Sequence, residues 1–150
     1  MIKQLDLTNQ QLAQSVLSIQ FPAYQVEANL IGFQWIPALS DTEEDLMNSK
    51  EIFIGFYEDS QLFGVLSYEE TEEIIDICRL VVSPDSFRKG VGRQLVEYVT
   101  NEVRQSRDVV VSTGQKNTPA VTLYKRLGFV EEETFEVADG VRLINLRYST

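Results

Sequence analysis

The sequence predicts an α/β domain built on a mixed, mostly antiparallel central sheet with helices on both faces. Strand-like apolar runs alternate with helical patterns in the order β α α (α) β β β α β α β β. Two pairs of strands are joined by tight turns, which makes each pair antiparallel. The 150 residues suit one hydrophobic core, and no repeat or Gly/Ser linker divides them, so we expect a single domain over residues 1–150.

The N-terminal half is expected to hold two helices between a first strand and a set of three more strands. The strand "IKQLDL" precedes the helix "QQLAQSVLSI", for which Asp6, Thr8 or Asn9 can act as N-cap. A second, short helix, "PAYQVEANLIG", is expected to begin at Pro22 and end at Gly32. The half is completed by the apolar loop "FQWIPALSD", the short acidic helix "TEEDLMNSK" and the strands "EIFIGFYED", "QLFGVLSYEE" and "EEIIDICRLVVS".

The C-terminal half is expected to alternate helices and strands. The helix "GVGRQLVEYVTNEVR" has apolar residues on one face and is followed by the buried-looking strand "DVVVST". The helix "TPAVTLYKRLG" tolerates Pro119 in its first turn. The strands "FVEEETFEV" and "VRLINLRYS" then form a hairpin around Asp139 and Gly140.

Composition excludes several classes of chemistry. The chain has no histidine and one cysteine, Cys78, which removes Ser-His and Cys-His pairs, disulfides and the usual zinc sites, so we expect no metal. A net charge of −10 argues against nucleic acid as a partner. No apolar run approaches the roughly 20 residues of a membrane span, and the first residues lack the apolar region of a signal peptide. We therefore expect a cytoplasmic protein with no membrane partner.

Charge is unevenly distributed along the chain. Three basic residues stand against fifteen acidic ones before Phe87, whereas eight basic residues stand against three acidic ones in residues 87–130. An acidic surface often serves only solubility. The basic middle segment of so acidic a chain nevertheless predicts a local anion site.

The basic segment opens with "SFRKGVGRQL", in which Gly90 and Gly92 follow a strand and begin a helix. The first amides of a helix lack internal partners and carry the positive end of its dipole, so this turn suits a phosphate group. Arg88, Lys89 and Arg93 add positive charge. Glycine pairs also occur in ordinary turns, and the spacing matches neither a Walker A loop nor GxGxxG.

A second stretch, "NTPAVTLYKRLGF", follows the next strand. Together with "VVSPDSFRKGVGRQL" it resembles the two acyl-CoA signatures of the GCN5-related N-acetyltransferase (GNAT) superfamily, and the order of predicted elements is similar to that fold over most of the chain. The family pattern begins with glutamine or arginine where Phe87 stands here, so one side-chain contact is lost. The backbone cradle depends on Gly90 and Gly92 and is retained.

The resemblance implies a site for acetyl-CoA as cosubstrate. The pyrophosphate would be held by the backbone amides of Arg88, Lys89, Gly90, Val91, Gly92 and Arg93. In this superfamily the preceding strand splays from its neighbour, so Leu80, Val81 and Val82 would offer backbone groups to the pantetheine arm. Asn117 matches an asparagine that contacts the pantetheine arm, and Tyr124 matches a tyrosine that gives a proton to the leaving thiolate.

Acetyl transfer to an amine needs a neutral amine, a polarised thioester and a proton for sulfur, and none of these requires histidine. Tyr124 is the candidate acid; the alternative is a tyrosine that only packs in the core. Asp76 is the candidate base, because histone-type members place a glutamate at the matching position. A solvent-exposed aspartate and a water relay are the alternatives. Strand alternation places Asp76 on the same face as Cys78, Leu80 and Val82 unless a bulge intervenes.

The N-terminal part lines the acceptor pocket in this superfamily. Here it contains the candidate substrate-binding residues Tyr24, Glu27, Phe33 and Trp35, although aromatic residues at such spacings are more often core. The acidic N-terminal part favours a cationic small-molecule amine or a basic peptide as acceptor. We therefore predict an N-acetyltransferase that works by direct attack in a ternary complex. The alternative is a non-catalytic acyl-CoA-binding or sensing module, and a homodimer is compatible with either.

Overall fold

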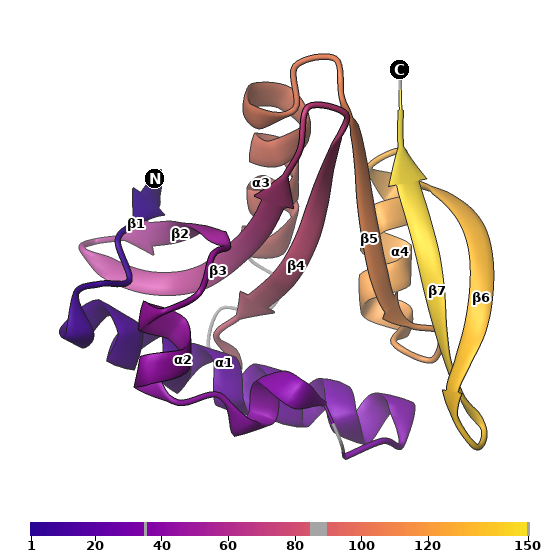
Figure 1. The fold of residues 1–150 in the computed structure, drawn as a ribbon, viewed down its shortest axis with the longest axis horizontal. Helices are drawn as coiled ribbons and strands as arrows, with labels where there is room; N and C mark the ends of the chain where they lie inside the picture. The colour runs from indigo at the N-terminus through magenta and orange to yellow at the C-terminus, as the bar shows by residue number, and fades with distance from the viewer. Residues whose placement is uncertain (35, 85–89, 150) are drawn as a thin grey trace.

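The computed structural model describes residues 1–34, 36–84 and 90–149, which form one seven-stranded sheet with flanking helices (Figure 1). The strands lie in the order β1-β2-β3-β4-β5-β7-β6. All neighbouring pairs are antiparallel except β4 and β5, which run parallel. The predicted mixed, mostly antiparallel sheet is confirmed. The strands are β1 (Ile2–Leu5), β2 (Ile52–Glu58), β3 (Gln61–Glu70), β4 (Ile74–Val82), β5 (Asp108–Gly114), β6 (Val130–Ala138) and β7 (Val141–Tyr148).

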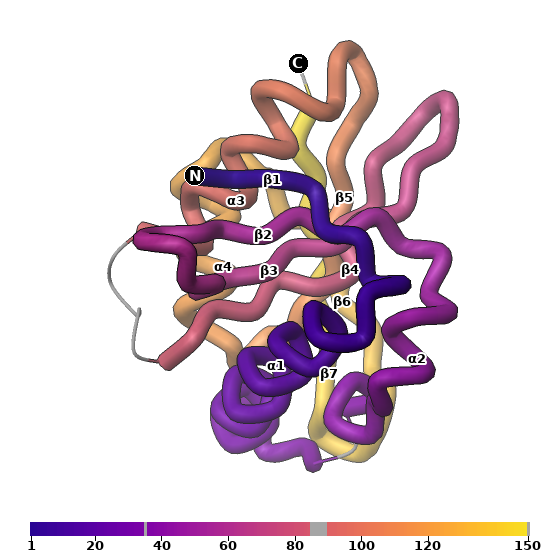
Figure 2. Tube along the Cα trace, turned by 90° about the vertical axis from the view of Figure 1, so that its left-hand side faces the viewer, coloured from indigo at the N-terminus to yellow at the C-terminus, as the bar shows by residue number. Residues whose placement is uncertain are grey.

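Helices cover both faces of the sheet, as predicted. One face, called the α1 face below, carries α1 (Gln10–Ile31), the 3₁₀ helix η1 (Pro37–Ser40) and α2 (Glu43–Met47); α1 and α2 lie together at the bottom of Figure 2. The opposite face, called the α3 face, carries α3 (Val91–Tyr98), its π-helical continuation η3 (Val99–Val103) and α4 (Thr118–Arg126). Among the helices in the described part of the chain, none is long and apolar enough to cross a membrane.

A single long helix, α1, replaces the two helices expected before Gly32. The Asn9 side chain caps its start by accepting a hydrogen bond from the Leu12 amide at 3.1 Å, and Gly32 ends it in the left-handed region at φ 69°. Pro22 lies inside the helix, so the prediction that a new helix begins there is wrong. An interior proline costs about 3 kcal/mol. One buried stripe runs past the proline, and its packing on the sheet offsets this cost: Ala13, Val16, Ile19, Gln20, Tyr24, Ala28 and Ile31.

Strand β4 contains a bulge that changes which side chains share a face. Ser67 of β3 pairs with Arg79, but Tyr68 pairs with Ile77, so Cys78 is an extra residue in β4. The parallel pairing of β4 with β5 also stops at Ile77, and the two strands separate beyond it (Figure 1). The splayed strand implied by the family resemblance is therefore present, and the separation opens the sheet between its two layers of helices.

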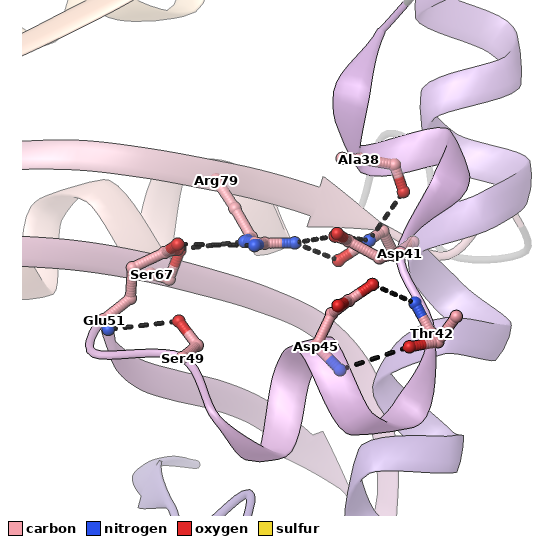
Figure 3. Close-up of polar contacts among 9 residues, drawn as sticks. Ala38, Asp41, Thr42, Asp45, Ser49, Glu51, Ser67 and Arg79 are labelled. Carbon is pink, nitrogen blue, oxygen red and sulfur yellow. Dashed lines mark hydrogen bonds and ion pairs between the residues drawn. The ribbon is translucent and has the colours of Figure 1, made fainter.

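A polar cluster around Arg79 ties the α1 face together at the bulge (Figure 3). The Arg79 guanidinium forms an ion pair with Asp41 and another with Glu51, whose Oε1 lies 2.9 Å from Nε. The same guanidinium donates to the side-chain oxygen of Gln20 at 3.0 Å, and the Ser67 hydroxyl donates to Glu51 at 2.5 Å. Gln20 and Ser67 are fully buried, so these partners satisfy polar groups that have no access to water. The cluster joins α1, the segment after η1, the start of β2, and strands β3 and β4.

The Arg79 cluster predicts an acid-sensitive contribution to stability. Burial acts to raise the pKa of Glu51, but the hydrogen bonds from Arg79 and Ser67 outweigh it and hold that pKa below its ordinary value of 4.5. A lowered folded-state pKa stabilises the protein above pH 4.5, and this contribution is lost as pH falls through the folded-state value. Glu51→Gln should lower the free energy of unfolding at pH 7 by about 2 kcal/mol. The gap to wild type should shrink below pH 4.5, as measured by urea unfolding.

Glu58→Gln, at an exposed end of β2, is the control and should leave the wild-type stability curve unchanged. A gap between Glu51→Gln and wild type that stays constant from pH 7 to pH 3 would contradict the assignment of this charge to the cluster.

Candidate active site

A cavity of about 610 Å³ lies where β4 and β5 separate. Helix α1 contributes one wall, and the start of α3 and one side of α4 contribute the opposite walls. The cavity reaches both faces of the sheet because no backbone ladder joins β4 to β5 beyond Ile77. A cleft of this size lined by apolar side chains with a few polar groups is typical of a small-molecule site.

The start of α3 forms one end of the cavity. Gly90 is its N-cap at φ 74°, where other residues are strained, and no side chain of the described residues caps the helix. Gly90, Val91, Gly92 and Arg93 all line the cavity. The first amides of α3 therefore have no side-chain partner among the described residues, and their binding of an anion stays a prediction. The predicted contacts of Arg88 and Lys89, and the departure at Phe87, lie outside the described residues.

Gly92 lies against the apolar wall of the cavity. A Cβ atom built on it would meet Leu123 at 3.6 Å, Val82 at 3.7 Å and Leu80 at 3.9 Å, which are ordinary contact distances. Alanine therefore fits at this position. A longer side chain extends among cavity-lining residues, so it obstructs the cleft.

The edge of β4 beyond the bulge forms the floor of the cavity. Leu80, Val81 and Val82 line it and pair with β3 on one side only. The other edge of this segment has no strand partner within the described chain, so its backbone groups can pair with an extended ligand. Val81 packs on the α1 face, whereas Leu80 and Val82 pack against the core of the α3 face.

Tyr124 of α4 projects into the cavity from the α3 face. Its side chain is almost completely buried, and its ring packs edge-on against Phe129 with centroids 5.2 Å apart. Burial, and secondly the negative charge of Glu27, raise the pKa of Tyr124 above its ordinary value. The phenol therefore stays protonated at neutral pH, and its conjugate base is a strong proton acceptor.

Glu27 and Asn117 meet across the cavity, a contact that no pattern in the sequence predicts. Asn117 Nδ2 donates to Glu27 Oε1 at 3.1 Å, and the Thr113 hydroxyl donates to the same oxygen at 3.4 Å. Asn117 also caps α4, because its side-chain oxygen accepts from the Ala120 amide at 3.4 Å. The two residues are 90 positions apart, and each was predicted separately, Asn117 for the pantetheine arm and Glu27 for the acceptor.

The four predicted acceptor residues have different positions. Tyr24 and Glu27 line the cavity from α1. Phe33 is partly exposed just after α1 and is not among the described lining residues, so the structure does not bring it to the cavity. Trp35 lies outside the described residues. Tyr24 also belongs to the core of the α1 face, where burial is the first cause of its raised pKa.

Asp76 does not share a face with Leu80 and Val82, so that prediction is wrong. The bulge at Cys78 changes the alternation, and Asp76 lies on the α1 face opposite Glu69 of β3, outside the cavity lining. Burial, followed by the negative charges of Glu69 and Glu51, raises the pKa of Asp76. A role of Asp76 as the base requires an acceptor amine that reaches the α1 face beside Glu69.

Cys78 lines the cavity, but its thiol is poorly suited to be a nucleophile. Burial, then the negative charges of Glu51 and other acidic neighbours, raise its pKa to about 12. One ligand atom from each of Glu51, Glu69 and Cys78 lies within 4.8 Å of the others. Glu51 is already bound by Arg79 and Ser67, so this arrangement carries no metal assignment.

Comparison with known proteins identifies the family. Residues 10–150 match the acetyltransferase (GNAT) domain family, and the chain belongs to the GNAT acetyltransferases. The UPF0157 protein YqkA of Bacillus subtilis (strain 168) is 42% identical over 143 residues, which make up 95% of this chain. The chain spans only 42% of the length of that relative.

Solved structures share the fold at low sequence identity. The protein smu.2055 from Streptococcus mutans UA159 superposes with a TM-score of 0.77 at 21% identity, covering 99% of this chain and 98% of that one. The ribosomal-protein-S18-alanine N-acetyltransferase of Escherichia coli gives 0.77 at 18% identity, covering 100% and 94%. The PaiA N-acetyltransferase of Thermoplasma acidophilum, in complex with coenzyme A, gives 0.76 at 14%, covering 99% and 98%.

Proposed function

We propose that this protein transfers the acetyl group of acetyl-CoA to a primary amine, by direct attack within a ternary complex. The observation that carries the proposal is the continuity of one cavity across three features of the described chain. It runs from the start of α3, which no described side chain caps, along the edge of β4 that has no described strand partner, to the Tyr124 side chain. An anion site, an extended groove and a proton donor thus follow one another in the order that a phosphate, a pantetheine arm and a thioester require. Membership of the GNAT acetyltransferases and the coenzyme A complex of a structural neighbour support the same cosubstrate.

Each part of the cavity has a distinct role in this proposal. The amides at Gly90–Arg93 bind the pyrophosphate, and the free edge of Leu80–Val82 pairs with the pantetheine arm. The amine nitrogen attacks the thioester carbonyl carbon as the carbon–sulfur bond breaks. Tyr124 gives its phenolic proton to the departing sulfur, and the phenolate then takes one proton from the acylated nitrogen, which restores the tyrosine. The alternative, a module that binds acyl-CoA without turnover, differs in releasing no CoA in the presence of any amine.

The first test concerns binding of acetyl-CoA at the start of α3. Gly92→Glu should abolish binding, because its side chain obstructs the cleft beside Leu80, Val82 and Leu123 and adds negative charge near the phosphates. Gly92→Ala is the matched control and should bind within a few-fold of wild type, since its Cβ makes only ordinary contacts. Calorimetry measures both, with circular dichroism to confirm folding. Wild-type protein that shows no binding at millimolar acetyl-CoA would contradict the proposal.

The second test concerns Tyr124 as proton donor. Tyr124→Phe retains the ring that packs on Phe129 but removes the hydroxyl, so acetyl-CoA affinity should change little. The kcat should fall by about 10²–10⁴-fold, the usual contribution of general acid catalysis. Tyr57→Phe, on β2 and away from the cavity, is the control and should keep wild-type kcat. A Tyr124→Phe variant with unchanged kcat, when chemistry limits the rate, would show that Tyr124 only packs.

The third test concerns the acceptor, for which we propose a cationic small-molecule amine or a basic peptide. Exposed Glu69 and Asp76 lie on the α1 face, and the Glu69 carboxylate is within 4.8 Å of the cavity-lining Cys78. Arg79, the nearby cation, is neutralised by Asp41 and Glu51. Acidic groups at the mouth of a cleft attract cations, and salt screens this attraction over about 8 Å at physiological ionic strength.

A panel of acceptors scored for CoA release should therefore favour spermidine-like and lysine-like amines, with kcat/KM falling as salt rises. Faster turnover of acidic or neutral amino compounds would contradict the electrostatic argument for the acceptor while leaving acetyl transfer itself intact.

A further inference from the structure

The side chain of Glu27 lines the cavity from α1. Helix α1 passes beneath the ends of β4 and β5 (Figure 1), and Glu27 is the one carboxylate among the described residues that line the cavity. Its Oε1 accepts both hydrogen bonds, from Asn117 and Thr113. Its Oε2 accepts none from the described part of the chain. A half-buried, cavity-lining carboxylate with one oxygen held and the other without a described partner can accept a hydrogen bond from a ligand.

The two residues that donate hydrogen bonds to Glu27 have their own positions set by other contacts. Asn117 uses its oxygen to cap α4, so its amide nitrogen must face Glu27. Thr113 is buried at the end of β5. The carboxylate is thus anchored to β5 and to the start of α4, while its backbone belongs to α1.

We propose, on the basis of the acetyl transfer proposed above, that Glu27 binds the acceptor ammonium through Oε2 and takes its proton before attack. The proton moves from nitrogen to the carboxylate, and the nitrogen lone pair then forms the bond to the acetyl carbon. The carbon–sulfur bond breaks and Tyr124 protonates the sulfur. The nitrogen loses its second proton to the Tyr124 phenolate, and Glu27 returns its own to solvent.

Burial makes this transfer feasible. Burial raises the pKa of Glu27, and the hydrogen bonds from Asn117 and Thr113 offset part of that rise. Burial of the pair disfavours the two charged forms relative to the neutral amine and carboxylic acid, which favours proton transfer within the pair. Asp76 is the competing carboxylate, but it lies outside the cavity lining and faces Glu69. The described titratable and charged groups that share the cavity with Glu27 are Tyr24, Cys78, Arg79, Arg93 and Tyr124.

The test compares wild type with Glu27→Gln over pH 6 to 10, with a lysine-like amine as acceptor. Glutamine keeps an oxygen for Asn117 and Thr113 but cannot accept the proton. At pH 7, kcat/KM for the amine should fall by about 10²-fold. Wild-type kcat/KM should vary little from pH 6 to 9, since Glu27 deprotonates the bound ammonium. The variant should gain about tenfold per pH unit, because only the neutral amine then reacts. Acetyl-CoA affinity should stay within a few-fold of wild type.

Three comparisons make the outcome decisive. Glu27→Asp should recover part of the activity and the flat pH profile, and Glu102→Gln, exposed on η3, should match wild type. A Glu27→Gln profile parallel to wild type would overturn the assignment, as would Asp76→Asn alone producing the tenfold-per-unit rise. Wild-type protein that releases no CoA with any amine would instead overturn the proposed function together with this inference.

Discussion

The separation of β4 from β5 beyond Ile77 is the constraint on which the rest of the site depends. Parallel pairing holds the two strands together over only four residue pairs, and it stops where the extra residue Cys78 enters β4. The separation leaves one edge of β4 without a strand partner in the described chain, and a cavity that connects both faces of the sheet. Helices from opposite faces can then place their side chains in one space, which a continuous sheet would prevent.

The bulge is stabilised by charge on one side and by apolar packing on the other. Arg79 follows the extra residue and is held by Asp41, Glu51 and Gln20 on the α1 face (Figure 3). On the α3 face, Leu80 and Val82 pack against the core that includes Leu95 and Tyr124. Because half-buried charges need all of their partners, a polar cluster at this position specifies one register of β4 more strictly than apolar contacts alone.

The site divides its chemistry between the two layers of helices. The α3 layer supplies the proposed anion-binding start of α3 and the protonated Tyr124, and both belong to the C-terminal half of the chain. The α1 layer supplies Glu27, which is brought to Asn117 and Thr113 only by the fold. The proposed cosubstrate and the proposed acceptor are thus recognised from opposite sides, and the sheet opening is where they meet.

The sequence by itself determined the order of elements, the mixed sheet and the glycine-rich start of α3, because periodicity, turn residues and helix signals act over a few residues. It also determined the family, through Gly90, Gly92, Asn117 and Tyr124. Only the tertiary structure decided that α1 continues through Pro22, since packing of a long buried stripe exceeds a local cost. It alone placed Asp76 on the α1 face, because a bulge depends on the partner strand. It alone joined Glu27 to Asn117, because a contact between residues 90 positions apart leaves no local pattern.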